Sequence, residues 1–405
     1  MSEWVWIVGG GELQLPAIRE AKRRGYKVIV SDGNELCVAY NQVDLFLHLD
    51  TYDAIEHARV ASRLRSEDYK IRGVLCPGAD VGPTVSAIVE VLNLRAVPYY
   101  IAERVRNKGM MRVVLGLLYP RYRVVHFPTD ILLERWIWFP CVVKPLDNCA
   151  TRGVSLVNRP DTLLEAVQYA LSSNKYACGA IVEECLYGEE HALDFFIVAG
   201  KAIWVNGTTR LYRTHIPGTR EPLFGIEAAA INPWQPPREV VDLATNAAAK
   251  LGVTEGPFKM DIVNDPRYGW CIYECATRLS GGWDSSYMSP LVGKDITGLL
   301  LDYSTGIKLT EELIREKTQW NGKYACFYVP YYKPGKIDGW KEICYDNTST
   351  IANLFIRSNT EIADLKTCAD RPVYIIATGS SLLNALRNAG RVRRYIQPKY
   401  KDGDA

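Results

Sequence analysis

The chain has 405 residues, of which 48% are hydrophobic and 23% are charged, and its formal net charge is +2. A chain of this length is expected to form two or three domains with large buried cores. The near-neutral charge gives no electrostatic argument for binding to nucleic acid or to an anionic membrane. No apolar run approaches the ~20 residues that span a bilayer, and the start, MSEWVWIVGGG, lacks the basic leader and cleavage site of a signal peptide.

The cysteines and histidines indicate a reduced protein without a zinc site. Eleven cysteines, an odd number in a long chain without a leader, favour free thiols and a cytoplasmic location over a disulfide framework. Cys271 and Cys275 lie in one expected strand without a second pair, and the five histidines show no metal-ligand spacing.

Residues 1–100 alternate strands and helices. Strands are expected at residues 5–8, 27–31, 44–49 and 73–76, with helices at 13–24, 52–64 and 81–92. This alternation predicts a doubly wound parallel sheet. The turn GGGELQ does not fit the dinucleotide-binding motif, and we interpret its glycines as a tight turn near a ligand. Asp32, which follows at about 20 residues, keeps a nicotinamide cofactor open as an alternative.

Two basic segments follow. Residues 101–118 are expected to form one helix in which Lys108 and Arg112 share a face. Residues 139–157 predict two strands around a small polar loop, residues 147–153, which can present backbone N–H groups to phosphate oxygens. Lys144 lies in the first strand, where an unpaired ammonium is costly, so a nearby anion would stabilise it. The alternative in both segments is a basic side chain that faces solvent.

Two segments in the middle of the chain suggest a nucleotide-binding strand end and a substrate-binding loop. In IVEECLYGEE, residues 181–190, a strand breaks into a turn at Gly188, and its backbone and carboxylates suit a purine and a ribose. A hairpin at 192–198 and 202–206 and a helix at 236–251 are also expected. Residues 208–233 show little regular period, and long irregular stretches in compact domains are usually functional. We interpret them as a substrate loop, although a disordered insertion is the alternative. Its arginines (Arg210, Arg213 and Arg220) suggest a substrate with an extra carboxylate or phosphate.

Residues 256–282 predict a hairpin that brings two carboxylates together. Folding the segment about a midpoint between Arg267 and Tyr268 places Asp261 opposite Glu274. Like charges in a cross-strand pair destabilise a sheet, and a divalent cation between them would resolve the conflict. Oxygen ligands without histidine or cysteine favour Mg²⁺ over zinc. Arg278 follows as a planar cation, although a hairpin whose carboxylates face water remains the alternative.

The last hundred residues predict a further sheet-rich piece. A helix is expected near residues 295–303 and a charged segment at 311–317. Strands at 325–329, 351–355 and 373–376 and a basic helix at 382–395 follow.

The order of these motifs resembles the ATP-grasp superfamily of carboxylate–amine ligases. The matching segments are NKGMMR, FPCVVKP with ATRGV, VEECLYGEE and KMDIV…YECATRLSGG, and the resemblance covers nearly the whole chain. The tail, from YVPYYKPGKIDG to DRPVYIIATGSSLLNALRNAG, looks like the carboxy-terminal subdomain of the L-amino acid ligase and carnosine synthase branch.

The resemblance implies an α/β (α+β) protein with the ATP-grasp fold, built from a doubly wound parallel-sheet domain, a mobile lid and an antiparallel-sheet core. The implied domains are an amino-terminal domain (1–102), a lid subdomain (103–187, with the phosphate loop 147–153), a core with the Mg²⁺ and ATP site (188–312) and a carboxy-terminal subdomain (313–405). A homodimer is expected from the resemblance alone.

Carried over position by position, the resemblance implies roles for individual residues. ATP would be held by Lys108, Lys144, Thr151, Arg152, Gly153, Glu183, Glu184, Cys185, Leu186 and Glu190. Mg²⁺ or Mn²⁺ would be held by Asp261 and Glu274, and Lys144 and Arg278 would act on the transferring phosphoryl group. The substrate would contact Arg210, Arg213, Arg220, Arg278, Gly281, Gly282 and Trp283, and substrate choice would rest on the three loop arginines and on Trp283–Ser286. The chain departs from the family at Ala276, where asparagine is usual, which puts the second metal position in doubt.

The expected activity is ATP-dependent formation of an amide bond between a carboxylate, expected to be an amino acid, and an amine, through an acyl phosphate. A purine-pathway ligase or carboxylase that uses formate or bicarbonate, and a nucleotide-binding protein without turnover, remain alternatives. The partners expected are small molecules, without nucleic acid or membrane.

Overall fold

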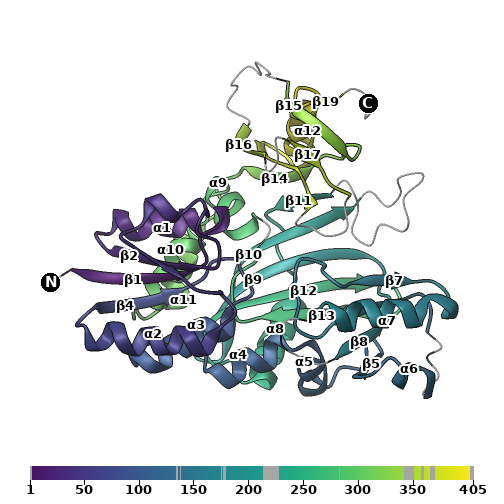
Figure 1. The fold of residues 1–405 in the computed structure, drawn as a ribbon, viewed down its shortest axis with the longest axis horizontal. Helices are drawn as coiled ribbons and strands as arrows, with labels where there is room; N and C mark the ends of the chain where they lie inside the picture. Colours follow the sequence, from purple (N-terminus) through teal and green to yellow (C-terminus); the bar gives the residue numbers. More distant parts are fainter. Residues whose placement is uncertain are drawn as a thin grey trace.

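The computed structural model describes residues 2–401 except 134–135, 137, 175, 177–178, 213–227, 282, 342–350, 357–359 and 365–369. An amino-terminal α/β layer, a small lid sheet and a large antiparallel sheet make up most of the molecule (Figure 1). Among the described helices, none combines the length and the apolar character needed to traverse a bilayer.

The amino-terminal layer is a four-stranded parallel sheet in the order β3-β2-β1-β4, as predicted. Helices α1 and α10 cover one face, and α2 and α3 cover the other (Figure 1). Alternate residues of β1 explain the two layers, because Val5 and Ile7 pack with α1 while Trp6 and Val8 pack with α2 and α3. The elements are β1 (Glu3–Val8), α1 (Leu15–Arg23), β2 (Lys27–Asp32), β3 (Leu45–His48), α2 (Ala54–Ser66), β4 (Lys70–Leu75), α3 (Gly82–Leu92) and, from later in the chain, α10 (Ile296–Ser304).

The glycine turn after β1 is held by Asp32. One carboxylate oxygen accepts from the Gly10 N–H at 2.7 Å, and the other accepts from the Asn34 N–H at 2.8 Å. Since both oxygens already serve the backbone, Asp32 offers no free carboxylate for a ribose. The structure therefore gives the nicotinamide alternative no support.

The single helix expected over residues 101–118 is wrong, because the segment forms two helices, α4 (Tyr99–Arg106) and α5 (Lys108–Leu115). Asn107 separates them with an extended backbone, and its side chain accepts from the Met110 N–H as the cap of α5. Lys108 and Arg112 are buried rather than solvated.

The lid is a four-stranded antiparallel sheet in the order β5-β8-β6-β7, with α7 packed on one face. Its elements are β5 (Tyr122–Val125), α6 (Asp130–Leu133), β6 (Cys141–Pro145), β7 (Ser155–Val157), α7 (Leu163–Ser172) and β8 (Ala180–Glu184).

The large sheet has eight antiparallel strands in the order β13-β12-β9-β10-β11-β14-β18-β16. Its strands are β9 (Glu189–Val198), β10 (Lys201–Tyr212), β11 (Ala228–Asn232), β12 (Gly256–Asp265), β13 (Gly269–Ala276), β14 (Tyr324–Val329), β16 (Ile351–Ile356) and β18 (Val373–Gly379). The expected irregular stretch at 208–233 is therefore partly wrong, since both of its ends are strands. The strands expected at 325–329, 351–355 and 373–376 extend this sheet, whereas residues 335–340, 361–362 and 398–400 form a separate three-stranded sheet.

Helices α4, α5 and α8 (Arg238–Leu251) cover one face of the large sheet through Phe195, Phe258 and Ile262. Side chains alternate along a strand, so the residues between them, including Lys259 and Asp261, lie on the opposite face. The remaining elements are η4 (Asp284–Met288), α9 (Ser289–Leu291), α11 (Glu311–Lys317), β15 (Gly335–Trp340), β17 (Glu361–Ile362), α12 (Leu382–Arg393) and β19 (Pro398–Tyr400).

Candidate functional site

The hairpin β12–β13 places Asp261 directly opposite Glu274, the pair expected from the sequence. The turn is centred on Arg267, half a residue from the expected midpoint, because Asp265 pairs with Gly269. A bulge at Tyr273 then shifts the register, so that Ile262 pairs with Ile272 while Asp261 pairs with Glu274. Without the bulge, Asp261 would oppose Tyr273.

Polar side chains continue across this face of the sheet. The row that begins at Glu274 and Asp261 passes through Ala192 of β9 to Thr208 of β10. A neighbouring row runs from Lys259 through Asp194 to Asn206. Adjacent strands lie about 4.8 Å apart, so Asp261 and Thr208 are separated by roughly 10 Å. Ala192, which lies between them, is small and buried.

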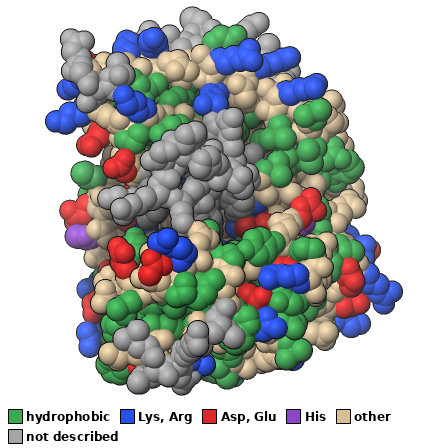
Figure 2. Space-filling model, turned by 90° about the vertical axis from the view of Figure 1, so that its right-hand side faces the viewer, with side chains coloured by type: hydrophobic (Ala, Val, Ile, Leu, Met, Phe, Trp, Pro, Cys, Tyr) green, Lys and Arg blue, Asp and Glu red, His purple; other side chains and the backbone are tan. Residues whose placement is uncertain are grey.

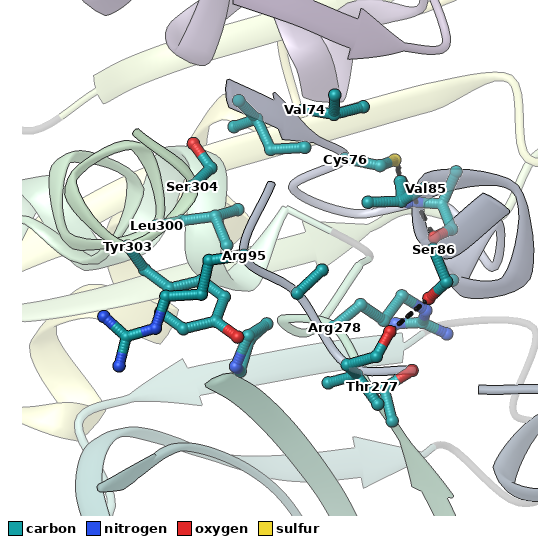
Figure 3. Close-up of a pocket in the computed structure, with 16 residues that line it drawn as sticks. Val74, Cys76, Val85, Ser86, Arg95, Thr277, Arg278, Leu300, Tyr303 and Ser304 are labelled. Atoms are coloured by element: carbon teal, nitrogen blue, oxygen red, sulfur yellow. Dashed lines mark hydrogen bonds between the residues drawn. The ribbon is translucent and has the colours of Figure 1, made fainter. Parts of the chain in front are cut away.

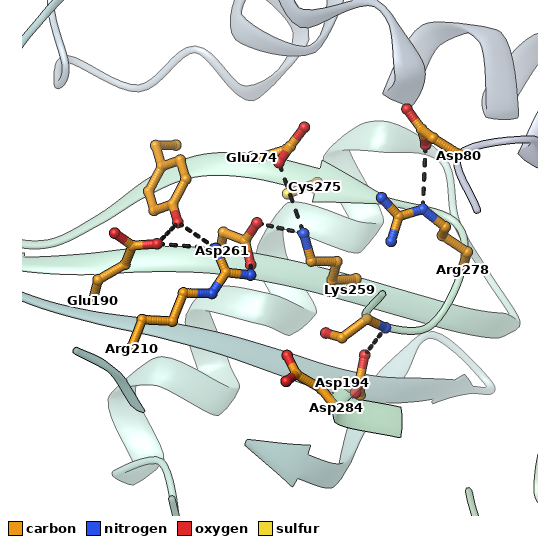
Figure 4. Close-up of polar contacts among 12 residues, drawn as sticks. Asp80, Glu190, Asp194, Arg210, Lys259, Asp261, Glu274, Cys275, Arg278 and Asp284 are labelled. Carbon is orange, nitrogen blue, oxygen red and sulfur yellow. Dashed lines mark hydrogen bonds and ion pairs between the residues drawn. The ribbon is translucent and has the colours of Figure 1, made fainter. Parts of the chain in front are cut away.

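Lys259 lies between the two carboxylates (Figure 4). Its ammonium contacts the Asp261 carboxylate, and it lies 3.7 Å from Glu274 Oε2. A lysine from the same strand therefore relieves part of the repulsion that a divalent cation is expected to resolve. Lys259 and Asp261 are both nearly fully buried, so the ion pair is shielded from water.

Further cations approach the same carboxylates. Lys108 Nζ lies 3.4 Å from Glu274 Oε1 and donates to the Asn148 carbonyl oxygen at 2.8 Å. Arg210 lies 3.4 Å from Asp261 and 3.0 Å from Glu190. Burial alone would raise the pKa of the Glu274 carboxyl, but Lys108 and the other cations hold that pKa well below its ordinary value.

Lys144 of the lid donates to Glu183 at 2.6 Å, and Arg112 of α5 contacts the other oxygen of Glu183 at 2.5 Å. Burial would raise the pKa of Glu183, but the two cations outweigh it and hold the pKa at about 2. The anion near Lys144 is thus Glu183 in this structure. Glu183, which is expected to contact ATP, is 3% exposed and is bound to two cations in this structure.

The loop at residues 147–153 has unusual backbone geometry. Ala150 and Thr151 are left-handed, with φ of 55° and 61°, a conformation that is unfavourable for a β-branched residue. Gly153 has φ of 73°, and a side chain there would collide with Ser173. Strain of this kind concentrates at ligand-binding segments.

Residues 184–186, at and just after the end of β8, belong to the segment that is expected to contact the nucleotide. The Glu184 N–H donates to Arg121 O at 2.9 Å, and the Cys185 N–H donates to Pro140 O at 3.1 Å, so both donors serve the lid. The Glu184 carboxylate pairs with Arg121 at 2.9 Å and Arg267 at 3.0 Å. Leu186, the next residue in the chain, also belongs to this segment.

The substrate residues expected from the sequence are only partly brought together. Arg278 lies 3.3 Å from Asp80, and a side chain at Gly281 would lie 2.7 Å from the Gly78 carbonyl oxygen. Trp283 is 2% exposed and packs among Tyr287, Phe327, Phe355 and Tyr374, so its ring has no free surface for a substrate. Arg213, Arg220 and Gly282 lie outside the described residues.

A small cavity lies between the amino-terminal layer and the large sheet (Figure 3). Its volume of about 40 Å³ has room for a few water molecules but not for a nucleotide. Cys76, Ser86, Arg95, Arg278 and Tyr303 contribute to its lining. On the face that carries the lid, basic side chains gather along the top in Figure 2, and acidic and basic side chains occur together below them.

Sequence reasoning missed Lys259, Asp80 and Asp194, and it placed Asp284 only within the segment 283–286 that is expected to set substrate choice. The alternation of β12 puts Lys259 on the same face as Asp261, which was a usable signal. Asp80 and Asp284 reach the site only through tertiary packing. Among the described residues no cluster of three acidic, cysteine or histidine side chains forms a ready metal centre.

The residues nevertheless fit a magnesium nucleotide. Asp261 and Glu274 supply hard oxygen ligands, and phosphates would supply the oxygens that the protein lacks. Lys108, Arg210 and Arg278 supply positive charge to those phosphates.

Residues 137–287 match the sequence profile of the ATP-grasp domain. Over 99% of each chain, the structure is similar to the L-amino acid ligase from Bacillus licheniformis, with a TM-score of 0.78 and 19% identity. It is also similar to the phosphoribosylglycinamide synthetase from Anaerococcus prevotii, with a TM-score of 0.70 and 16% identity over 99% of this chain and 100% of that one. At these identities the likeness establishes the fold.

A curated relative is the formate-dependent phosphoribosylglycinamide formyltransferase of Erythrobacter litoralis, which is 26% identical over 175 residues, 42% of this chain and 44% of the relative. The chain spans between 44% and 64% of the length of the curated relatives that it matches.

Proposed function

We propose that this chain, which contains an ATP-grasp domain and has the ATP-grasp fold, is an ATP-dependent ligase that joins a carboxylate to an amine. The carboxylate is proposed to be an amino acid. An acyl phosphate would form first with release of ADP, and the amine would then displace phosphate to give the amide.

The observation that carries this proposal is the convergence of cations on the Asp261–Glu274 pair. Lys108 comes from α5 and Arg210 from β10, at 3.4 Å from Glu274 and from Asp261 respectively. Phosphoryl transfer is catalysed by positioning and by electrostatic stabilisation, which such a group of charges provides.

When bound, Mg·ATP would supply the phosphoryl group and a divalent charge held by Asp261 and Glu274. Lys108 and Lys144 would then orient phosphate oxygens, the latter by leaving its contact with Glu183. Arg278 would face the charge that spreads over the transferring oxygens. The substrate carboxylate oxygen attacks phosphorus, and the bond to the ADP oxygen breaks.

The remaining expected roles stay proposals. Residues 147–153, with Thr151, Arg152 and Gly153, would close over the phosphates and exclude water. The segment at Glu184–Leu186 would meet the adenine and Glu190 the ribose. The homodimer and the cytoplasmic location also remain predictions.

A second candidate is a purine-pathway ligase of the same fold that uses formate or bicarbonate. Two observations favour it: the name of the curated relatives and the likeness to a phosphoribosylglycinamide synthetase. The two candidates share the ATP site and differ in the acid and the amine.

A screen of phosphate release tests both candidates. The protein is incubated with Mg·ATP and each amino acid, singly and in pairs, and separately with formate or bicarbonate, and products are identified by mass spectrometry. Phosphate release with a dipeptide-like product supports the first candidate, and release that depends on formate or bicarbonate supports the second. The control is Asp261→Asn, which should release no phosphate. Binding of ATP without release in any arm would instead indicate a nucleotide-binding protein without turnover.

A further inference from the structure

Two buried carboxylates lie at the end of the polar face away from the lid. Asp194 of β9 and Asp284 of η4 are 1% and 3% exposed and lie near one another (Figure 4). Asp194 accepts from the Ser280 N–H at 2.6 Å and from Asn206 Nδ2 at 3.4 Å. The Asp284 carboxylate accepts from the Thr208 hydroxyl at 3.2 Å through Oδ2. Asp194 thus accepts a hydrogen bond on each of its oxygens, whereas the residues that the structure describes give Asp284 a donor on one.

The position of Asp284 connects it to the proposed reaction centre. Its partner Thr208 lies in the same row of the sheet as Asp261 and Glu274, with Ala192 between. That row spans roughly 10 Å from Asp261 to Thr208, a distance that suits a small substrate whose reacting carboxylate lies near the metal pair. Ala192, which lies between them in this row, has a small side chain and is 2% exposed.

The surroundings of Asp284 contain an acceptor that lacks a donor. Among the described residues, the Asn232 Oδ1 atom is buried without a hydrogen-bond partner. Asn232 donates through Nδ2 to Asn206, which in turn donates to Asp194, so the unpartnered oxygen belongs to the same network. Buried polar atoms without partners are costly in a native structure, and they indicate an absent donor.

A protonated primary amine matches this deficit because it brings three N–H donors and a positive charge. Burial raises the pKa of Asp284 to about 7, although Arg210 opposes that rise. A bound cation would stabilise the ionised carboxylate.

We propose that Asp284, with Thr208 and Asn232, forms a subsite for a primary ammonium group of a substrate. This inference rests on the proposed ligase function. The ammonium group could belong to the amine acceptor or to the amino acid that is activated, and these two sources are separated by experiment.

The test compares wild type with Asp284→Asn, which keeps the shape and removes the charge. Three reactions are measured: amino acids with hydroxylamine as acceptor, their des-amino analogues with hydroxylamine, and amino acids with a second amino acid as acceptor. Hydroxylamine is largely uncharged near neutral pH, so it needs no ammonium subsite. Loss of the charge-assisted contact should reduce the affected reaction roughly 10- to 100-fold.

If the acceptor occupies the subsite, the variant retains hydroxamate formation and loses the reaction with an amino acid acceptor. If the activated acid occupies it, the variant loses hydroxamate formation from amino acids and retains it from des-amino analogues. Equal loss in all three reactions overturns the proposal. Asp194→Asn is the matched control and should affect all three alike, since both of its oxygens are bound by the protein.

A binding measurement separates this inference from the proposed function. Thermal unfolding of both proteins is followed with ethylammonium chloride and, for comparison, sodium chloride. Ethylammonium should raise the melting temperature of wild type above the sodium chloride value and should not do so for Asp284→Asn. Identical responses of the two proteins overturn the subsite, whereas a wild type that forms no hydroxamate overturns the ligase.

Discussion

At the scale of single residues, Lys259 decides how the carboxylate pair is stabilised. Its cross-strand partner is Ala276, the position at which the family usually has asparagine. The short alanine side chain is therefore the neighbour of an ammonium that contacts Asp261 and approaches Glu274 to 3.7 Å. Lys259 and Ala276 thus form a cross-strand pair at the place where the resemblance implies a second metal ligand.

Lys259→Met should make the protein depend on a divalent cation for stability. Removing the ammonium leaves Asp261, 1% exposed, beside Glu274 with less compensating charge. Breaking a buried ion pair costs about 3–5 kcal/mol, so the free energy of unfolding should fall by that amount without metal. Urea unfolding with and without MgCl₂ measures the effect, and Mg²⁺ should stabilise the variant more than wild type.

Lys201→Met, an exposed lysine at the start of β10, is the control and should leave both curves unchanged. If Mg²⁺ stabilised wild type and Lys259→Met equally against urea, the Lys259 ammonium would not occupy the place of a divalent cation.

At the scale of elements, Arg112 connects the lid to the bulge of β13. It contacts Glu183 of β8, and it donates to the carbonyl oxygens of Ile272 and Tyr273, each at 2.8 Å. Those two carbonyls flank the place where the register shifts. Since a shift of one residue reverses the face of every side chain, the bulge decides whether Glu274 faces Asp261.

Arg112→Lys should weaken both the fold and nucleotide binding. A lysine ammonium cannot reproduce three contacts from one planar group, so we expect a loss of about 3 kcal/mol in the free energy of unfolding. Glu274 would then be held less firmly opposite Asp261, and calorimetry should show weaker binding of Mg·ADP.

Arg59→Lys on α2, with a side chain that is 74% exposed, is the matched control and should be neutral. Wild-type affinity for Mg·ADP in Arg112→Lys would contradict a role for this arginine in setting the register.

The same hairpin illustrates what the sequence could predict. Asp261 and Glu274 were paired correctly from the turn, but only because the off-centre turn and the bulge at Tyr273 cancel. Alternation of strands and helices was enough for the parallel sheet, since it follows from local periodicity. The break at Asn107 carried a capping signal that helix periodicity obscured. The position of Asp80 beside Arg278 depends on a contact between distant segments, which no local pattern encodes.

At the scale of the whole molecule, the candidate site depends on the packing of the amino-terminal layer against the rest. Arg278, two residues after β13 of the large sheet, lies 3.3 Å from Asp80 of that layer. The Tyr52 hydroxyl contacts Cys149 of the 147–153 loop at 3.5 Å. The groups proposed to bind phosphate are therefore held by contacts from a different part of the chain.

Gly281→Ala should loosen this packing. A Cβ at Gly281 would lie 2.7 Å from the Gly78 carbonyl oxygen, which is backbone and cannot rotate away. The segment that carries Asp80 would have to move, so Arg278 would lose its partner and the free energy of unfolding should fall by roughly 1–3 kcal/mol. Urea unfolding measures the loss, and phosphate release in the substrate screen should fall with it.

Gly390→Ala is the matched control, because Gly390 lies inside α12 with no atom within 4 Å of the added Cβ. Alanine favours a helix interior over glycine by about 1 kcal/mol, so this control should be neutral or more stable. If Gly281→Ala were as stable and as active as Gly390→Ala, the close approach of Gly281 to Gly78 would not be needed for the packing of the two layers. The contact between Arg278 and Asp80 would then be independent of how the two layers pack.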